Sequence, residues 1–185
     1  MKESDLILIV KAQQGDRNAF RQIVENTQGM VYQVAYRFLR GQHDAEDAVQ
    51  EVYVRLWKNL SKYNSHIKLT TWLYRITSNY CLDVIKSASY RQQSKQADTD
   101  GLQLEDPRLA DKRLDQREMN ELILSAADRL TPVQKAVFIL RDLEGLSVEE
   151  VCENLSMKSD TLKSNLYHAR KKMSVLLKPF QNELL

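Results

Sequence analysis

Residues 44–57 read D-A-E-D-A-V-Q-E-V-Y-V-R-L-W, and this stretch decides how the N-terminal half of the chain folds. Its apolar residues recur at the three-and-four spacing of one helical face: Ala45, Ala48, Val49, Val52 and Leu56. Asp44 stands where an N-cap residue belongs, and Glu46 and Asp47 suit the positive end of a helix dipole. The stretch therefore predicts an amphipathic helix whose N-cap is Asp44.

The opposite face of this helix is acidic and yet carries an apolar side chain, Val54. Its members are Asp47, Gln50, Glu51, Val54 and Lys58. A single exposed valine is common on protein surfaces, so an ordinary solvated face is one interpretation. The other interpretation is a rigid acidic platform with an apolar anchor, suited to gripping another protein.

The whole stretch resembles the helix with which sigma factors of the extracytoplasmic-function (ECF) group grip the clamp of bacterial RNA polymerase. The match is long and has no gap. It implies that this face binds the β′ clamp of the polymerase core. The residues implied in that contact are Asp44, Asp47, Gln50, Glu51 and Val54.

The composition favours an all-α protein. The chain has 185 residues, of which 43% are hydrophobic and 28% charged, enough for one domain or two small ones. Only five Gly and three Pro are present, so long helices can run unbroken. We expect a cytoplasmic protein, because no signal peptide opens the chain and no apolar run approaches the roughly 18 residues of a membrane span.

The spacing of the two cysteines does not indicate a metal site. Cys81 and Cys152 lie far apart, and neither has a Cys or His neighbour at the spacing of metal ligands. Both fall inside helical patterns, which predicts small buried hydrophobic residues in a reducing compartment. We expect neither a metal nor a cofactor.

Two amphipathic helices precede residue 44. The first begins near Leu6 and is ended by Gly15–Asp16, and the second runs from about Ala19 to Arg40, where Gly29 could bend or divide it. The sequence pattern L-I-x-x-x-x-x-x-x-G-D-x-x-A-F, from residue 6 to residue 20, resembles the opening helix of ECF sigma factors. An ordinary helical hairpin explains the hydrophobic periodicity but not this particular sequence pattern.

A polar stretch, residues 59–71, leads into a helix predicted from about residue 71 to residue 87. The core stripe expected on that helix is Trp72, Leu73, Ile76, Tyr80 and Val84. Basic and amide side chains, Arg75, Asn79 and Lys86, lie on another face. Aromatic, amide and basic groups together suit unstacked single-stranded bases, whereas a solvated face edged by tyrosines is the equally open structural alternative.

The wording T-W-L-Y-R-I-x-x-N-x-x-x-D, from Thr71, resembles the promoter-reading helix that binds the −10 element in the same family. Leu69 and Thr70 depart from the aromatic and basic pair usual before that Thr-Trp. The family also tends to follow the helix with several arginines, where this chain offers only Lys86 and Arg91. The −10 residues implied by the resemblance are Tyr63, Lys68, Thr71, Trp72, Arg75, Asn79 and Lys86.

Residues 92–109 break the helical pattern and predict a linker, because they are polar and include Gly101 and Pro107. We expect an N-terminal domain over residues 1–91 and a C-terminal domain over residues 110–185. A linker of this length could extend to about 60 Å. Two domains so joined could sit on separated elements of one promoter.

The C-terminal half predicts a helix-turn-helix. A helix over residues 110–128 is followed by Thr131 as an N-cap with Pro132 at the first helical position. Ser147 and Glu150 form a capping box that starts a short helix, and a tight turn leads to a helix over residues 159–176.

Charge supports DNA binding by the second of these helices. Residues 142–153 hold five acids and no base, whereas residues 158–178 hold six Lys or Arg against one acid. A basic helix on an acidic scaffold suits phosphate binding, and a solvated charged helix is the alternative.

The wording G-L-S-x-E-E-V-x-x-x-L-x-x-x-x-x-T-L-K-S-x-L-x-x-A-R-K-K resembles the helix-turn-helix that reads the −35 element in ECF sigma factors. Ser156 and Asp160 replace a usual glycine, and Asn165 and His168 replace a usual arginine, so the promoter sequence read can differ. The −35 residues implied are Lys158, Ser159, Thr161, Lys163, Ser164, Asn165, Arg170 and Lys171.

These resemblances imply an ECF-type sigma factor that directs the RNA polymerase core to promoter DNA. The family often uses an anti-sigma protein, although no residue here identifies one. The residues alone support a helical protein with a DNA-binding C-terminal domain, so a transcription regulator that acts without core polymerase stays open. An enzyme is disfavoured, because neither a Glu-x-x-His pattern nor a Gly-rich phosphate loop is present.

Overall fold

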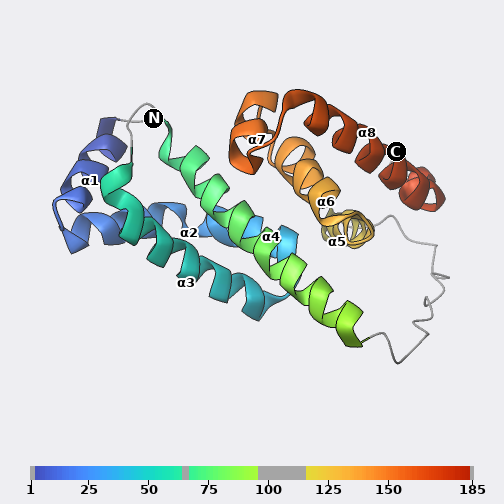
Figure 1. Ribbon diagram of the computed structural model, residues 1–185, viewed down its shortest axis with the longest axis horizontal. Coiled ribbons are helices and arrows are strands. Elements are labelled where there is room, and N and C mark those ends of the chain that lie inside the picture. Colours follow the sequence, from blue (N-terminus) through green and yellow to red (C-terminus); the bar gives the residue numbers. More distant parts are fainter. Residues whose placement is uncertain (1–2, 64–66, 96–115, 184–185) are drawn as a thin grey trace.

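The computed structural model describes residues 3–63, 67–95 and 116–183 (Figure 1). The N-terminal half contains α1 (Glu3–Gln13), α2 (Arg17–Leu39), α3 (Gln42–Asn59), η1 (Leu60–Lys62) and α4 (Leu69–Lys95). The C-terminal half contains α5 (Gln116–Ala127), α6 (Pro132–Phe138), η3 (Ile139–Leu143), α7 (Val148–Leu155), α8 (Ser159–Leu177) and η4 (Lys178–Glu183). No strand occurs in these ranges, and the all-α prediction is confirmed.

Helix α2 is flanked at both ends by residues with non-helical backbone conformations. Asp16 caps its N-terminus, because the carboxylate accepts hydrogen bonds from the backbone amides of Asn18 (2.8 Å) and Ala19 (3.1 Å). At the other end Arg40 adopts a left-handed φ of 65°, which stops the helix. Gly29 does not divide α2, which is continuous from residue 17 to residue 39.

Helix α3 begins earlier than its sequence indicates. The predicted N-cap, Asp44, is wrong: Gly41 is the N-cap, and Asp44 lies in the first turn. The Asp44 carboxylate folds back over Gly41, where its Oδ2 would lie 2.5 Å from a Cβ atom. Glycine therefore leaves the space that this carboxylate occupies, and the acid faces the positive end of the helix.

The N-terminal helices enclose a core of their own. The buried residues of this core are Ile9, Ala12, Ala19, Ile23, Val31, Val52, Tyr53, Leu56, Leu60, Leu69 and Leu73. Of the predicted apolar stripe on α3, Val52 and Leu56 are buried in this core and Val49 packs against it, whereas Ala45 and Ala48 belong to a second cluster that includes residues of the C-terminal half. Tyr53 joins the N-terminal core through a hydrogen bond of 2.8 Å between its hydroxyl and that of Thr27, and burial raises the pKa of Tyr53 to about 12.

Helix α4 is longer than predicted and is buried on more than one side. It extends from residue 69 to residue 95, beyond the predicted range 71–87. Leu73 is fully buried, but Trp72, Ile76, Tyr80 and Val84 of the predicted core stripe are only partly buried. Ser78, Cys81 and Leu82 are buried instead. The reason is that the C-terminal half packs against α4, through α6 and α7.

The C-terminal half confirms the predicted capping. Thr131 and Gln134 form a reciprocal capping box at α6, with Pro132 at the first helical position. Ser147 and Glu150 form a second capping box at α7. Helix α7 ends at Ser156, whose left-handed φ of 51° turns the chain toward α8 and completes the helix-turn-helix.

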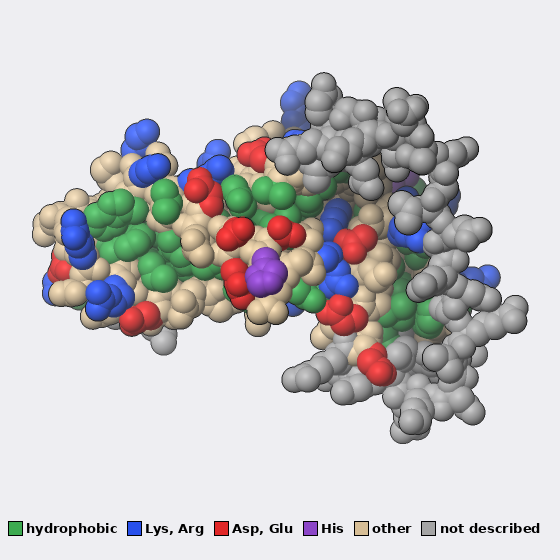
Figure 2. Space-filling model, turned by 90° about the horizontal axis from the view of Figure 1, so that it is seen from below, with side chains coloured by type: hydrophobic (Ala, Val, Ile, Leu, Met, Phe, Trp, Pro, Cys, Tyr) green, Lys and Arg blue, Asp and Glu red, His purple; other side chains and the backbone are tan. Residues whose placement is uncertain are grey.

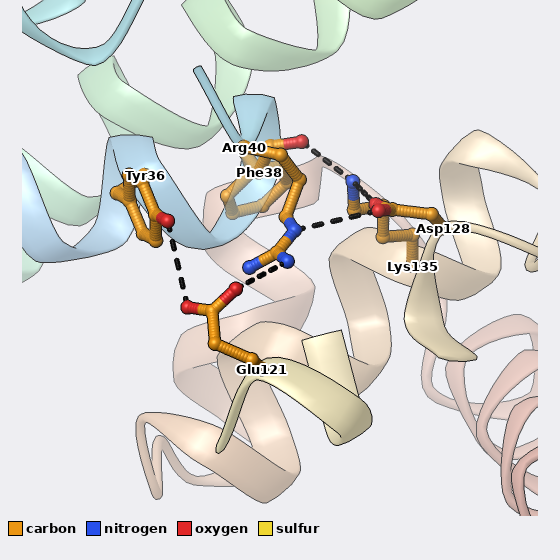
Figure 3. A network of polar contacts seen from close by, with 6 residues as sticks. All are labelled: Tyr36, Phe38, Arg40, Glu121, Asp128 and Lys135. Carbon is orange, nitrogen blue, oxygen red and sulfur yellow. Dashed lines mark hydrogen bonds and ion pairs between the residues drawn. The ribbon is translucent and has the colours of Figure 1, made fainter. Parts of the chain in front are cut away.

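The two halves also share polar contacts (Figure 3). The Lys135 ammonium of α6 donates hydrogen bonds of 2.6 Å each to the Phe38 carbonyl of α2 and to Asp128. Arg40 meets Glu121 at 2.7 Å and Asp128 at 3.4 Å. One half therefore supplies a donor to a backbone carbonyl near the C-terminus of a helix in the other, an end that cations stabilise.

Lys135→Met should lower the free energy of unfolding by about 1–3 kcal/mol. Lys135 is only 7% exposed, and the substitution keeps its apolar stem while removing the donor to the buried Phe38 carbonyl. Urea denaturation followed by circular dichroism measures the change. Lys171→Met, on the exposed side of α8, is the matched control and should stay within about 0.5 kcal/mol. Equal stabilities for the two variants would contradict this role of Lys135.

Candidate functional site

The outer face of α3 presents the five residues predicted to grip a partner. At 100° per residue, positions 44, 47, 50, 51 and 54 occupy about a third of the helix circumference. Asp44, Asp47, Gln50 and Val54 are exposed, and Val54 is 43% exposed among the acids. Seen from below, acidic side chains gather near the middle of the molecule (Figure 2). The structure therefore brings these five residues together on one accessible surface.

Glu51 is the one member of this surface that is held in place. Its carboxylate accepts a hydrogen bond of 2.8 Å from Arg55 one turn later. The Arg55 guanidinium in turn lies over the Tyr80 ring of α4, 4.9 Å from its centroid. Burial raises the pKa of Tyr80, and the nearby Glu51 carboxylate adds to the shift. The acidic face is thus anchored to α4.

Two hollows border the acidic face, and sequence reasoning missed both. One, of about 350 Å³, is lined by Arg17, Phe20 and Trp57, and Trp57 is 39% exposed with its ring 4.7 Å from that of Phe20. The other, of about 440 Å³, lies between α2 and α3. Its lining residues are Gln28, Gly29, Tyr32, Glu46, Val49 and Gln50. The sequence feature that could have indicated the first hollow is Trp57, the last residue of the stretch 44–57.

Helix α4, with Lys68 just before it, carries a stripe of exposed basic and amide residues. Positions 68, 75, 79 and 86 lie within about 40° of one another around the helix axis. Lys68, Arg75, Asn79 and Lys86 are all exposed, and Thr71 beside them is partly buried. The structure brings the basic and amide side chains predicted for single-stranded DNA into one line.

The aromatic members of that predicted set pack against each other. The rings of Tyr63 and Trp72 are 5.2 Å apart and tilted by 37°. The Tyr63 hydroxyl donates a hydrogen bond to the Ile67 carbonyl, just before α4. Residues 64–66 of the predicted base-holding segment lie outside the described residues. Both rings are partly buried, so their mutual packing fixes the start of α4.

Helix α8 of the helix-turn-helix has a buried face and a polar face. Leu162, Ala169 and Met173 are buried. The exposed members of the predicted −35 set are Lys158, Thr161, Lys163, Ser164, Arg170 and Lys171, and Ser159 and Asn165 are partly buried. The Asn165 amide donates a hydrogen bond of 2.8 Å to the Thr161 carbonyl. This bond engages one donor of Asn165 within its own helix.

Arg170 differs from the lysines of the predicted −35 set, because it is already paired with a carboxylate. Its guanidinium makes two hydrogen bonds to the Asp142 carboxylate, of 2.9 and 2.6 Å, and this pairing raises the pKa of Arg170. The neighbouring Lys172 donates to the Arg129 carbonyl. A hollow of about 500 Å³ beside them is lined by Lys163, Leu166, Tyr167, Arg170 and Lys171, and Tyr167, absent from the predicted set, is 62% exposed.

The described residues hold no cluster of three or more His, Cys, Asp or Glu side chains that could bind a metal ion. Over the same ranges, none of the helices combines the length and the apolar character needed to cross a bilayer. The three polar surfaces on α3, α4 and α8 are therefore the features that a function has to explain.

Comparison with known families assigns both halves of the chain. Residues 23–91 match sigma-70 region 2, and residues 120–173 match sigma-70 region 4. The region 2 match covers α3 and most of α2 and α4. A transcription regulator that acts without core polymerase, the alternative left open by the residues, does not account for this N-terminal match.

Relatives extend over most of the chain. It is 31% identical over 169 residues to the ECF RNA polymerase sigma factor SigW of Bacillus subtilis (strain 168), covering 88% of this chain and 90% of the relative. It is 25% identical over 183 residues to the ECF RNA polymerase sigma-E factor of Haemophilus influenzae, covering 95% and 96%.

Two solved structures share the fold. CnrH, in complex with the cytosolic domain of CnrY, aligns with a TM-score of 0.67 at 23% identity, covering 96% of this chain and 99% of the other. The sigma factor RpoE in complex with the anti-sigma factor NepR, from Bartonella quintana, aligns with a TM-score of 0.65 at 21% identity, covering 86% and 96%. With both halves matched in order and a relative at 31% identity, this chain belongs to the ECF sigma factors, which direct RNA polymerase to promoters.

Proposed function

We propose that the three exposed surfaces divide the work of a sigma factor. The α3 face binds the β′ clamp of core polymerase, the α4 stripe holds an unpaired base of the −10 element, and the first turns of α8 read the −35 element. The observation that carries this proposal is the position of Val54, 43% exposed on an otherwise polar and acidic face. An apolar group flanked by carboxylates suits a partner that offers a hydrophobic contact rimmed by basic residues.

The α4 stripe has the chemistry of a single-strand binding surface. Lys68, Arg75 and Lys86 supply positive charge for the phosphate backbone, and Asn79 supplies an amide that can pair with a base edge. The acidic face of α3 is tied to α4 through the contact of Arg55 with Tyr80. Polymerase binding at α3 therefore fixes the orientation of the DNA-facing stripe.

Different parts of α8 are suited to contacts with bases and to contacts with phosphates. The N-terminal residues of a recognition helix enter the major groove, which assigns base contacts to Lys158, Ser159 and the two turns after them. Lys171 lies two turns beyond Lys163 and suits a phosphate. Arg170 can reach a phosphate only by giving up its two hydrogen bonds to Asp142.

An anti-sigma protein is a further proposed partner, and RNA synthesis itself is the chemistry of the polymerase. The support for that partner is the likeness in fold to RpoE, which was solved with the anti-sigma factor NepR. In vitro transcription with purified core enzyme and a genomic promoter library tests the proposed function, because a sigma factor acts only when core enzyme is present.

Asp47→Lys combined with Glu51→Lys should abolish binding to core polymerase, because two carboxylates of the α3 face become cations. Both residues lie on the outer side of α3, so far-UV circular dichroism should show unchanged helicity. A pull-down with core enzyme measures the binding. Glu25→Lys, at an exposed position of α2, is the matched control and should bind like the parent. Unaltered affinity of the double variant would remove α3 from the interface.

Asn79→Ala should impair promoter opening more than core binding. The exposed amide is the only Asn or Gln on the α4 stripe as described, and alanine removes its base-pairing donors and acceptor. Permanganate footprinting of the melted region measures opening, and Gln22→Ala on the exposed side of α2 is the control. Identical footprints for Asn79→Ala and the parent would place the base site elsewhere.

Lys163→Ala and Lys171→Ala should affect DNA binding in different ways. A lost base contact at Lys163 should cost about 1–3 kcal/mol and relax preference at particular promoter positions. A lost phosphate contact at Lys171 should weaken all sequences equally and reduce the salt dependence by about one unit of slope. A panel of promoter variants assayed at two salt concentrations separates the two effects. Uniform weakening by Lys163→Ala would show that this lysine is a phosphate contact.

A further inference from the structure

Two triplets of side chains on α8 lie two helical turns apart. Seven residues advance an α-helix by about 700°, only about 20° short of two full turns, and by roughly 10 Å along its axis. Residues 170–172 therefore lie on nearly the same three lines of the helix surface as residues 163–165. The earlier triplet belongs to the set proposed to contact the −35 element, and the later triplet is the basic cluster that follows it.

Both outer cations of the later triplet are bonded to residues outside α8. The Arg170 guanidinium makes hydrogen bonds of 2.9 and 2.6 Å to the two oxygens of the Asp142 carboxylate in η3. The Lys172 ammonium donates a hydrogen bond to the Arg129 carbonyl, between α5 and α6. Arg170 and Lys172 lie about 160° apart around the helix axis, one on each side of the buried face of α8. The helix is therefore held on both flanks of its buried face.

The middle residue of the later triplet, Lys171, lies on a different side of the helix. It is about 100° from each of its neighbours, opposite the buried face, and it is exposed. Ser164, on nearly the same line two turns earlier, is exposed as well. The later triplet therefore divides: its outer members bond within the protein, and its middle member is accessible to a partner.

The pair of Arg170 and Asp142 has the geometry of an ion pair that orients a helix. Isolated ion pairs on a protein surface contribute little, but a bidentate contact between guanidinium and carboxylate is the favourable case, because two parallel hydrogen bonds fix both side chains. The Asp142 side chain is 19% exposed and that of Arg170 is 57% exposed. If Arg170 moved to a DNA phosphate, it would exchange one oxyanion for another and leave the Asp142 carboxylate unpaired. The exchange therefore brings little gain.

Fixing the rotation of α8 matters for base recognition. Arg170 lies on nearly the same helix line as Lys163, and Lys172 on nearly the same line as Asn165. Rotating the helix about its axis by about 20° would move atoms at its surface, 5–6 Å from the axis, by roughly 2 Å. A hydrogen bond to a base edge would not survive that displacement, because donor–acceptor distances span only about 2.7–3.2 Å.

We propose that Arg170, paired with Asp142, is a positioning residue for recognition of the −35 element. The pair fixes the rotation of α8 about its own axis, so that Lys163 meets particular bases, and Lys172 supports the opposite flank. This inference rests on the proposed assignment of α8 to the −35 element. It gives Arg170 an internal role in place of the DNA contact implied by the resemblance.

Arg170→Met and Asp142→Ala should both reduce the preference among −35 sequences by about tenfold, because α8 is no longer held in one orientation. Core polymerase carrying each variant is assayed on promoters that differ at single −35 positions, at two salt concentrations. For Arg170→Met, the slope of log affinity against log salt should stay within about 0.3 of the parent, because no phosphate contact is lost. Unchanged helicity by circular dichroism shows that the variants fold.

Arg170→Lys separates an oriented fork from a positive charge. Lysine keeps the charge but cannot make two parallel hydrogen bonds to a carboxylate, so it should lose preference as Arg170→Met does. A phosphate, in contrast, accepts lysine as a point charge. Glu153→Ala removes an acid at an exposed position of α7, and as the matched control for Asp142→Ala it should keep the parental preference.

The pair itself is measured in the free chain by nuclear magnetic resonance, without polymerase or DNA. The Nε–H group of Arg170 donates to Asp142 at 2.9 Å, so its proton should exchange slowly with water. Asp142→Ala should remove this protection, and Glu153→Ala should keep it. A protected Nε–H group together with a parent holoenzyme that ignores every change in the −35 element would refute the proposed function of α8 and leave the pair intact.

Three outcomes would overturn the positioning role. The first is an Arg170 Nε–H group that exchanges rapidly in the free parent chain. The second is an Arg170→Met variant that weakens all promoters equally and lowers the salt slope by about 0.9, which is the behaviour of a lost phosphate contact. The third is an Arg170→Lys variant that keeps the parental preference among −35 sequences.

Discussion

The structure depends on helix α4 being buried by both halves of the chain. Leu73 belongs to the core that α1, α2 and α3 enclose, whereas Cys81 and Leu82 belong to the cluster shared with α6 and α7. A helix that packs on two sides leaves less surface for recognition, and the exposed surface of α4 includes the stripe of Arg75, Asn79 and Lys86, which Lys68 continues just before the helix. The side of α4 proposed to face DNA is therefore bounded by sides that are packed inside the protein.

Polar groups at the ends of elements complete this arrangement. Helix α2 ends near two residues whose neighbours come from the C-terminal half: the Phe38 carbonyl receives Lys135, and Arg40 meets two carboxylates. Arg40 reaches them from a left-handed conformation that costs a non-glycine residue of the order of 1 kcal/mol. This local strain is offset by the ion pairs and by the chain reversal it allows before α3.

On the α3 and α8 surfaces, some charged side chains form ion pairs with neighbouring residues of the same chain. Glu51 pairs with Arg55, and Arg170 is held by Asp142, although both Glu51 and Arg170 have residue types expected at an interface with protein or DNA. Such pairs orient neighbouring side chains and reduce the charge available to a partner. At the interfaces proposed for α3 and α8, binding strength should depend on the unpaired charged residues of each surface more than on the total number of charges in the sequence.

The sequence by itself determined which segments are helical, the N-caps of α6 and α7, and the helical face on which the predicted surface residues lie. Helical period is a local property, which is why Val54 could be assigned to the acidic face and Thr131 and Ser147 to N-caps. The resemblance in residues 44–57 added the family, because it carries side-chain identities that periodicity does not. The N-cap of α3 was missed because Gly41 has no side chain to cap with, whereas Asp44 resembles a cap three residues later.

The tertiary structure alone decided which side of α4 is buried and how the two halves meet. Ser78 and Cys81 lie on a side of the helix that local pattern leaves open, and they are buried because residues about 60 positions later pack over them. The pairing of Arg37 with Glu144 joins residues 107 positions apart, and no local rule links two charges at that separation. Contacts between distant segments depend on packing in three dimensions, and only the folded chain reveals them.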